Sequence, residues 1–167
     1  MPALEDAATA LTHLDAQGQA RMVGVSAKAE SHRGAHARAS VRLSEAAFLA
    51  VRDASGAKGD ALQVARLAGI QGAKRTAELI PLCHPLRLTR LDVQATLEAP
   101  LVHFDVRVEA VDRTGVEMEA MTGAAVAALT LYDMIKAVDR AACIEAVRLL
   151  EKWGGKSGHF HPHGPPP

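Results

Sequence analysis

The segment from Gly115 to Arg140 places a long uncharged stretch between groups of acidic and basic side chains. Alanine, leucine and methionine dominate from Thr122 onward and no proline interrupts them, which predicts a helix. Because residues 124–131 carry no charge at all, we expect this part of the helix to be buried on most sides. A buried helix is therefore the element around which we expect the rest of the chain to be organised.

Two charged residues, Asp133 and Lys136, follow the uncharged stretch on one face of this helix. Glu119, fourteen residues upstream, would point nearly the same way if the helix began that early. Buried charges are unfavourable unless they are paired or used. Two interpretations stay open: a buried ion pair at the end of a core helix, or a site where Asp133 and Lys136 handle protons or phosphate.

Composition limits the classes of protein that fit. At 167 residues the chain is long enough for one domain with a real core, and with 3% aromatic residues that core must consist of Ala, Val and Leu. Lysine plus arginine balance aspartate plus glutamate at 19 each, which argues against a general nucleic-acid binder. Such a core suits helices that pack close together, or an oligomer.

The cellular setting is inferred from absent signals. No run of 18 apolar residues exists, so we expect no membrane span, and residues 1–19 carry acids without an apolar stretch, so we expect no signal peptide. The two cysteines, Cys83 and Cys143, have no metal-like spacing and suggest no disulfide framework. We therefore expect a cytoplasmic enzyme or binding protein.

Alternation and capping residues predict the remaining elements. Ser44 and Asp60 are placed to cap helices, and residues 87–97 and 102–111 flank a turn, as in an antiparallel hairpin. The expected strands are 22–26, 36–43, 87–97, 102–111 and 142–150, and a charged segment before residue 36 is expected to be a solvated loop. The order β-α-β-β-α-β predicts an α+β sandwich of ferredoxin-like type with an antiparallel sheet.

The chain ends outside this sandwich are expected to be loose. We expect a flexible N-terminal arm at residues 1–21, a single domain at 22–158 and a flexible His/Pro tail at 159–167. The sequence Gly155-Lys156-Ser157 ends like a phosphate loop, but residue 150 is leucine where that loop needs glycine, so we reject a nucleotide triphosphatase. The alternating histidines 159, 161 and 163 could catch a stray metal ion, although the prolines after them favour disorder.

Two loops carry further candidate contacts. Lys58 lies between two glycines just before a helix, which suits anion binding, although an exposed loop lysine is the commoner case. Residues 79–86, LIPLCHPL, form a proline-stiffened apolar loop. Its neighbours Cys83 and His84 face opposite ways in extended chain, so we expect no thiol–imidazole pair. The apolar, proline-bound context of Cys83 predicts a buried, inert thiol. His84 is either a packed structural histidine or a donor to a ligand.

Four segments together resemble the MoaC family of molybdenum-cofactor biosynthesis, the cyclic pyranopterin monophosphate synthases. They are MVGVSAKAESHR, KGDALQVARLAGIQGAKRTAELIPLCHPL, TGVEMEAMTGAAVAALTLYDMIKAVD and VRLLEKWGGKSGHF, and the resemblance runs from about Met22 to Phe160. One position departs from the family, which usually has M-V-D-V-S near the start where this chain has Gly24. The departure removes a carboxylate close to the expected site and puts any role of that acid in doubt.

The resemblance implies a function and a set of site residues. It implies a lyase that converts 3′,8-cyclo-7,8-dihydro-GTP, supplied by a radical SAM GTP cyclase, to cyclic pyranopterin monophosphate with release of pyrophosphate. It implies a ferredoxin-like fold in a homohexamer built as a trimer of dimers, with each active site at a dimer interface. No metal is obligatory, though Mg²⁺ could accompany the triphosphate. By position, the catalytic residues are Asp133, Lys136 and Lys58, and the substrate contacts are Leu82, Cys83, His84, Met118, Glu119, Lys152, Lys28, Arg33 and Glu117.

The same residues allow two other classes of protein. A non-catalytic nucleotide-binding regulator would need the cations but no buried Asp133, and a scaffold subunit would need neither. We also expect a site shared between chains, because the alanine-rich run 124–128 suits a tight helix contact and the site residues are scattered in sequence. Lys58 and Asp133 are the first pair to test for placement on different chains.

Overall fold

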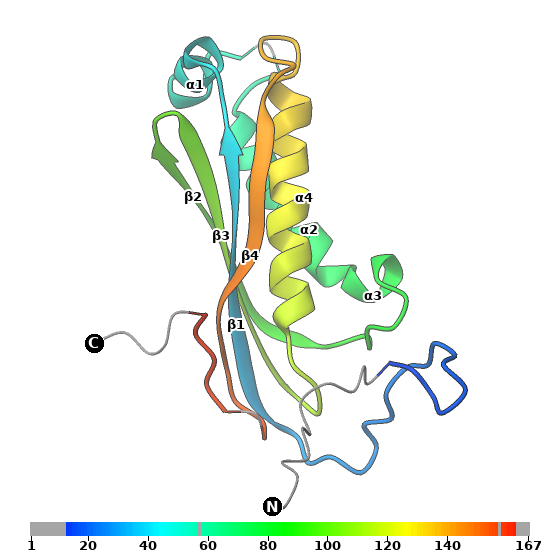
Figure 1. Ribbon diagram of the computed structural model, residues 1–167. Helices are drawn as coiled ribbons and strands as arrows, with labels where there is room; N and C mark the ends of the chain where they lie inside the picture. The colour runs from blue at the N-terminus through cyan, green and yellow to red at the C-terminus, as the bar shows by residue number, and fades with distance from the viewer. Residues whose placement is uncertain (1–12, 57, 157, 163–167) are drawn as a thin grey trace, which may run out of the picture.

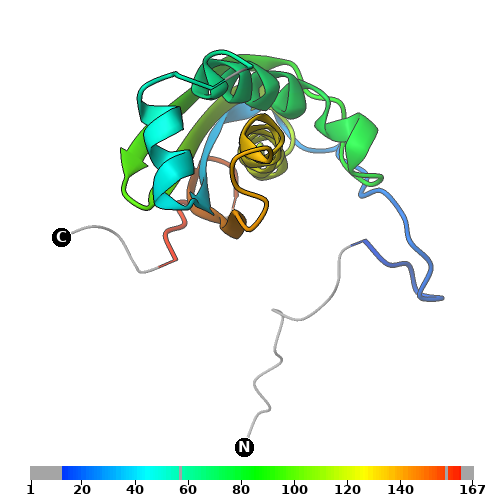
Figure 2. The same cartoon turned by 90° about the horizontal axis from the view of Figure 1, so that it is seen from above.

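The computed structural model describes residues 13–56, 58–156 and 158–162, which form a four-stranded antiparallel sheet with helices on one face (Figures 1 and 2). The strand order is β2-β3-β1-β4, and one helical crossover follows β1 and another follows β3. This is the expected β-α-β-β-α-β sandwich of ferredoxin-like type. The elements are β1 Ser31–Arg42, α1 Glu45–Arg52, α2 Ala61–Lys74, α3 Thr76–Leu79, β2 Leu88–Glu98, β3 Leu101–Asp112, α4 Glu117–Ile135 and β4 Cys143–Trp153.

Local signals fix the starts of two helices. The Ser44 side chain accepts a hydrogen bond from the backbone N–H of Ala47, and Asp60 accepts from the N–H groups of Leu62 and Gln63. Both side chains satisfy backbone donors that have no partner within their helix. Both predicted caps are confirmed. The helix that Asp60 caps, α2, ends at Lys74, and after Arg75 the short helix α3 follows.

The core consists of small side chains, as the composition predicts. The face of the sheet that the helices cover carries alternate residues of β1 and β3, and α4 adds its own alanines. These buried residues include Ala35, Ala37, Ala39, Val41, Val102, Phe104, Val106, Val108, Ala124, Ala127, Ala128 and Leu131. Because alanine projects so little, the helices and the sheet can approach one another closely.

Helices α2 and α4 lie side by side and touch through glycines (Figure 1). A Cβ atom on Gly69 would lie 3.0 Å from the carbonyl oxygen of Gly123, and one on Gly72 would lie 2.8 Å from Cβ of Val126. The alanine-rich run of α4 therefore packs within one chain. The expectation that this run serves a contact between chains is wrong for its buried alanines, because α2 and the sheet already cover them.

The starts of one helix and one strand differ from the sequence-based expectations, and one expected strand does not form. Helix α4 begins at Glu117 and not at Thr122, so Glu119 lies in its first turn. Strand β1 begins at Ser31, so His32 and Arg33 belong to the sheet and not to a solvated loop. Residues 22–26 are irregular and not a strand, because they pair with no neighbouring strand.

The two described ends of the chain differ in their placement. Residues 13–30 form a loop that runs away from the helices and sheet (Figure 2), with a small turn closed by pairing of Leu14 with Ala20. At the other end Phe160 pairs with Lys152, so the start of the expected tail lies against β4. His163 lies outside the described residues. None of the helices that the structure describes has the length and apolar character of a membrane span.

Candidate active site

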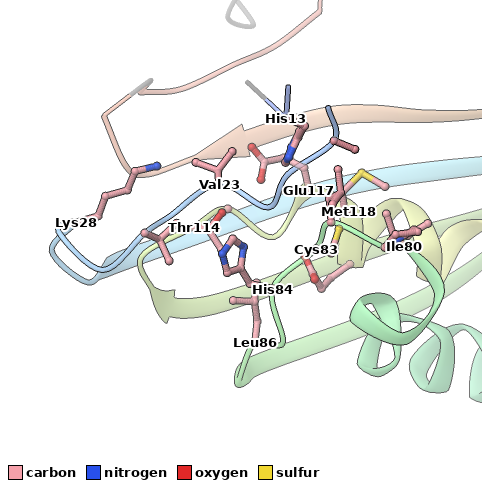
Figure 3. Close-up of a pocket in the computed structure, with 16 residues that line it drawn as sticks. His13, Val23, Lys28, Ile80, Cys83, His84, Leu86, Thr114, Glu117 and Met118 are labelled. Carbon is pink, nitrogen blue, oxygen red and sulfur yellow. The ribbon is translucent and has the colours of Figure 1, made fainter. Parts of the chain in front are cut away.

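A cavity of about 840 Å³ lies beside the first turn of α4 (Figure 3). Three segments far apart in sequence form its walls: the irregular loop of residues 13–28, the proline-stiffened loop of residues 80–86, and residues 114–119. Most of the lining is apolar, including Val23, Val25 and Ile80. A few polar groups converge on this apolar space, which is the usual make-up of a small-molecule site.

The cavity collects most of the substrate contacts that the family resemblance implies. Figure 3 shows Lys28, His84 and Glu117 coming from three different walls. Seven of the nine implied contacts line the cavity: Lys28, Leu82, Cys83, His84, Glu117, Met118 and Glu119. His13 and Thr114 also line it, and no sequence pattern indicates either as a site residue.

The other two implied contacts, Lys152 and Arg33, are not part of the cavity wall. The Lys152 ammonium is 3.4 Å from the Glu117 carboxylate, which does line the cavity. The Arg33 side chain donates a hydrogen bond of 3.0 Å to the backbone carbonyl of Asp112. Lys152 is therefore connected to the cavity through Glu117, whereas Arg33 holds the ends of β1 and β3 together.

Glu119 is the most buried ionisable group of this site, with 4% of its surface exposed. Burial raises its pKa to about 7, a backbone hydrogen bond opposes the rise, and the negative charge of Glu117 adds to it. A carboxyl group that titrates near neutral pH can both accept and donate a proton under physiological conditions. The structure therefore gives Glu119 the properties of a general acid or base, beyond the substrate contact that the resemblance implies.

Cys83 is partly buried in the same wall. Burial raises the pKa of its thiol, and the negative charge of Glu119 raises it further. A raised pKa keeps the thiol protonated, and the protonated thiol is a poor nucleophile. The structure thus agrees with the expected inert thiol.

The three residues implied to be catalytic gather at the other end of α4. Lys58 donates to the carbonyl oxygen of Asp133 at 3.0 Å and to its carboxylate at 3.1 Å, and Lys136 lies 2.7 Å from the same carboxylate. Hydrogen bonds from Lys136 and then Lys58 lower the pKa of Asp133, so it is ionised at neutral pH. A lysine pair on one carboxylate leaves an excess positive charge, which suits a phosphate group.

The structure contradicts two hypotheses for this cluster: that Asp133 and Lys136 form a buried ion pair, and that Lys58 and Asp133 belong to different chains. The side chains of Asp133 and Lys136 are 56% and 53% exposed, so they form no buried ion pair. They lie at the last turn of α4, where the helix leaves the cover of the core. Lys58 and Asp133 are also in direct contact within one chain, so they are not a pair split between chains.

The two groups of candidate residues are far apart in one chain. Glu119 and Asp133 are fourteen residues apart on α4, which corresponds to about 21 Å along the helix axis. Figure 1 shows α4 running lengthwise along the sheet, so its two ends are well separated. The structure therefore brings together the cavity residues, and separately Lys58, Asp133 and Lys136, but not the two groups with each other.

A family model and two curated relatives match most of the length of this chain. The family model described as MoaC family matches residues 22–155. The chain is 58% identical over 150 residues to the cyclic pyranopterin monophosphate synthase of Thermomicrobium roseum, covering 89% of this chain and 90% of the relative. It is 54% identical over 152 residues to the protein of the same name from Heliobacterium modesticaldum, covering 90% and 96%. The chain belongs to the MoaC family.

Proposed function

We propose that this protein is a cyclic pyranopterin monophosphate synthase that acts on 3′,8-cyclo-7,8-dihydro-GTP and releases pyrophosphate. The observation that carries the proposal is the cavity beside α4, which gathers seven of the nine substrate contacts implied by the family resemblance. Two relatives that are 58% and 54% identical to it over the aligned residues carry that name. The reaction is an early step of molybdenum cofactor biosynthesis, in which a radical SAM GTP cyclase would supply the substrate in the cytoplasm.

The chemistry of the cavity suits such a substrate. Apolar walls such as Val23, Val25 and Leu82 can cover a purine-derived ring system and exclude water from it. The rearrangement moves protons between nitrogen, oxygen and carbon, and Glu119, with a pKa of about 7, suits such transfers. Lys28 offers a cation on the cavity wall for a phosphate group.

The second proposal is that two copies of the chain complete each site. Glu119 in the cavity wall lies about 21 Å from Asp133 along α4 of the same chain, too far for one small substrate to touch both. A two-fold pair can instead place Lys58, Asp133 and Lys136 of one copy over the cavity of the other, and symmetry then makes two equivalent sites. Three such dimers would form the homohexamer that the family resemblance implies.

The lysines of the second group would then act on the leaving pyrophosphate. Asp133 holds Lys58 and Lys136 within 3.1 Å of its own carboxylate, so both ammonium groups are positioned before the substrate arrives. Prepositioned cations stabilise the negative charge that develops on the leaving group. A Mg²⁺ ion could accompany the triphosphate without being obligatory.

The deciding experiment is incubation of the purified protein with the cyclised GTP substrate, followed by measurement of pyrophosphate and of the cyclic phosphate product. A synthase releases both in equal amounts. A nucleotide-binding regulator would bind the compound without turnover, and a scaffold subunit would do neither. Glu119→Gln serves as the matched inactive variant, because it removes the carboxyl group and keeps nearly the same shape.

A companion variant, Gly24→Asp, tests the departure of this chain from the family pattern. The space around Gly24 is open, since nothing lies within 4 Å of a Cβ atom built there, so the substitution should be tolerated. If the missing acid assists the reaction, Gly24→Asp releases pyrophosphate faster than the unmodified chain. Equal rates would mean that the acid is dispensable.

A further inference from the structure

The chain reverses direction directly after β4. Gly154 and Gly155 have φ angles of 83° and 72°, which side chains rarely permit. A Cβ atom on Gly154 would also lie 2.2 Å from the carbonyl oxygen of His32, so the turn needs glycine for space as well. The reversal returns the chain to β4, where Lys152 and Phe160 exchange two backbone hydrogen bonds of 3.1 and 2.9 Å.

This reversal places two imidazoles against one carboxylate. Side chains alternate along an extended chain, so His159 and His161 leave it on the same side. Their Nε2 atoms lie 2.7 and 3.5 Å from the same oxygen of Glu151, and their ring centroids are 4.7 Å apart. The three ligand atoms all lie within 4.8 Å of one another.

We propose that Glu151, His159 and His161 form a binding site for a divalent transition-metal ion of the Zn²⁺ class. Tetrahedral Zn²⁺ with ligands at about 2.0–2.2 Å holds neighbouring ligand atoms about 3.3 Å apart. The distance of 3.5 Å between Nε2 of His161 and the Glu151 oxygen already fits this spacing. The distance of 2.7 Å between Nε2 of His159 and the same oxygen would increase once the ion replaces the proton that these two atoms share. Without an ion, only the His159 ring forms a hydrogen bond with Glu151. A metal ion would bond to both imidazole rings at once.

The donor set indicates which ions the site prefers. Two imidazole nitrogens and one carboxylate oxygen favour Zn²⁺, Co²⁺ or Ni²⁺, whereas Mg²⁺ and Ca²⁺ prefer oxygen ligands alone. The side chain of His159 is 55% exposed, so a water molecule can complete the coordination. The site is thus distinct from any place where Mg²⁺ would accompany a triphosphate.

The position of the cluster suggests a structural task. Three protein ligands would fasten residues 159–161 to the end of β4, next to Lys152. The Lys152 ammonium in turn lies 3.4 Å from Glu117 in the cavity wall. A bound ion would therefore hold the C-terminal segment in place beside the proposed substrate cavity without taking part in the reaction.

The test is calorimetric titration of the chelator-treated protein, prepared without an affinity tag, with zinc chloride. The expected result is one zinc ion per chain. Glu151→Gln and His161→Ala should each weaken the zinc affinity at least tenfold, because even the loss of a residue that only supports a metal ligand costs about tenfold or more. Co²⁺ gives a second readout, because its visible absorption reports coordination directly. That absorption should weaken in both variants.

His32→Ala is the matched control, because His32 is also an exposed histidine with a glutamate oxygen 2.8 Å from its Nε2 atom, that of Glu109. Its zinc affinity should equal that of the unmodified chain. Absence of zinc binding by the unmodified chain would overturn the proposal. So would tight binding by Glu151→Gln, which would mean that histidines of a loose tail chelate the ion without β4.

Discussion

At the scale of single residues, Asp133 holds two lysines and is the residue on which catalysis should depend most. Asp133→Asn keeps the shape but removes the charge that attracts Lys58 and Lys136. We expect pyrophosphate release to fall by about 100-fold or more. The unfolding temperature should hardly change, because exposed ion pairs contribute little stability.

The control for this substitution is Asp53→Asn. Asp53 is a similarly exposed carboxylate, and its ion pair is with the neighbouring Arg52 and not with a residue of either candidate group. The control should keep full turnover. Equal rates in Asp133→Asn and the unmodified protein would rule out the catalytic role of Asp133.

Cys83 should be dispensable although it lines the cavity. Burial raises the pKa of its thiol, so the reactive thiolate is scarce at neutral pH. We expect Cys83→Ser to retain most of the pyrophosphate release. Mass spectrometry of the enzyme during turnover should find no substrate attached to Cys83, and a covalent adduct there would contradict this prediction.

Glu119 should make the stability of the fold depend on pH. Its folded pKa of about 7 lies above the ordinary 4.5, so the folded state holds a proton that the unfolded state releases. The stability that this proton supplies is complete below pH 4.5 and is lost as the pH rises through 7. Glu119→Gln should therefore be more stable than the unmodified protein at pH 8, by up to about 3 kcal/mol.

Urea unfolding at pH 5 and pH 8 measures this difference. Glu78→Gln, on the exposed part of α3, controls for the loss of one negative charge. Only Glu119→Gln should show a higher free energy of unfolding than the unmodified protein at pH 8. The same gain in both variants would show that the effect comes from net charge and not from burial.

At the scale of elements, the close contact of α2 and α4 should depend on glycine. A Cβ atom on Gly72 would lie 2.8 Å from both Cβ and Cγ2 of Val126, a β-branched side chain that cannot turn aside easily. Alanine favours a helix by about 1 kcal/mol over glycine. We expect the clash to outweigh this gain, so Gly72→Ala should lower the free energy of unfolding by about 1–3 kcal/mol.

The neighbouring Gln71→Ala is the control, since Gln71 lies on the exposed face of the same helix. Chemical denaturation should show no loss of stability for Gln71→Ala. If Gly72→Ala were as stable as this control, the helices would not be in the close contact that the structure describes.

Elements with local signals could be predicted from the sequence, and those without them could not. Ser44 and Asp60 form caps with groups two or three residues away, so their role is visible in the sequence. Helix α4 begins after Val116, whose side chain makes no capping hydrogen bond, so the start expected at Thr122 lies five residues too late. Residues 22–26 alternate like a strand, but their apolar members Val23 and Val25 face the cavity.

At the scale of the whole molecule, the two groups of site residues should meet only when two chains pair. Protein carrying His84→Ala lacks a cavity residue, and protein carrying Asp133→Ala lacks the lysine-binding carboxylate. In a two-fold dimer that contains one of each, one of the two sites is intact. Random subunit exchange should therefore restore about a quarter of the pyrophosphate release.

The control mixes Lys58→Ala with Asp133→Ala. Lys58 and Asp133 touch within one chain, so no mixed dimer regains an intact group and no activity should return. Recovery in this control, or none with His84→Ala, would contradict the shared site. A monomer that stays fully active at high dilution would contradict it as well.

The family resemblance names candidate site residues, but it does not say how far apart they lie. The family resemblance supplied all twelve candidates, and seven of them line one cavity. Residues fourteen positions apart on a helix share a direction but differ by four turns in position along it. The separation of Glu119 from Asp133 therefore depends on where α4 begins, which the sequence left open.

The small side chains of the core have a consequence for the thermodynamics of folding. Alanine has no rotamers to lose on burial, and valine has few, so ordering this interior gives up little side-chain entropy. Small side chains also bury little apolar area, so each contributes only a modest hydrophobic gain. For each core residue of this fold, a small hydrophobic gain therefore opposes a small loss of side-chain entropy. In a core rich in phenylalanine and methionine, both the gain and the loss are larger.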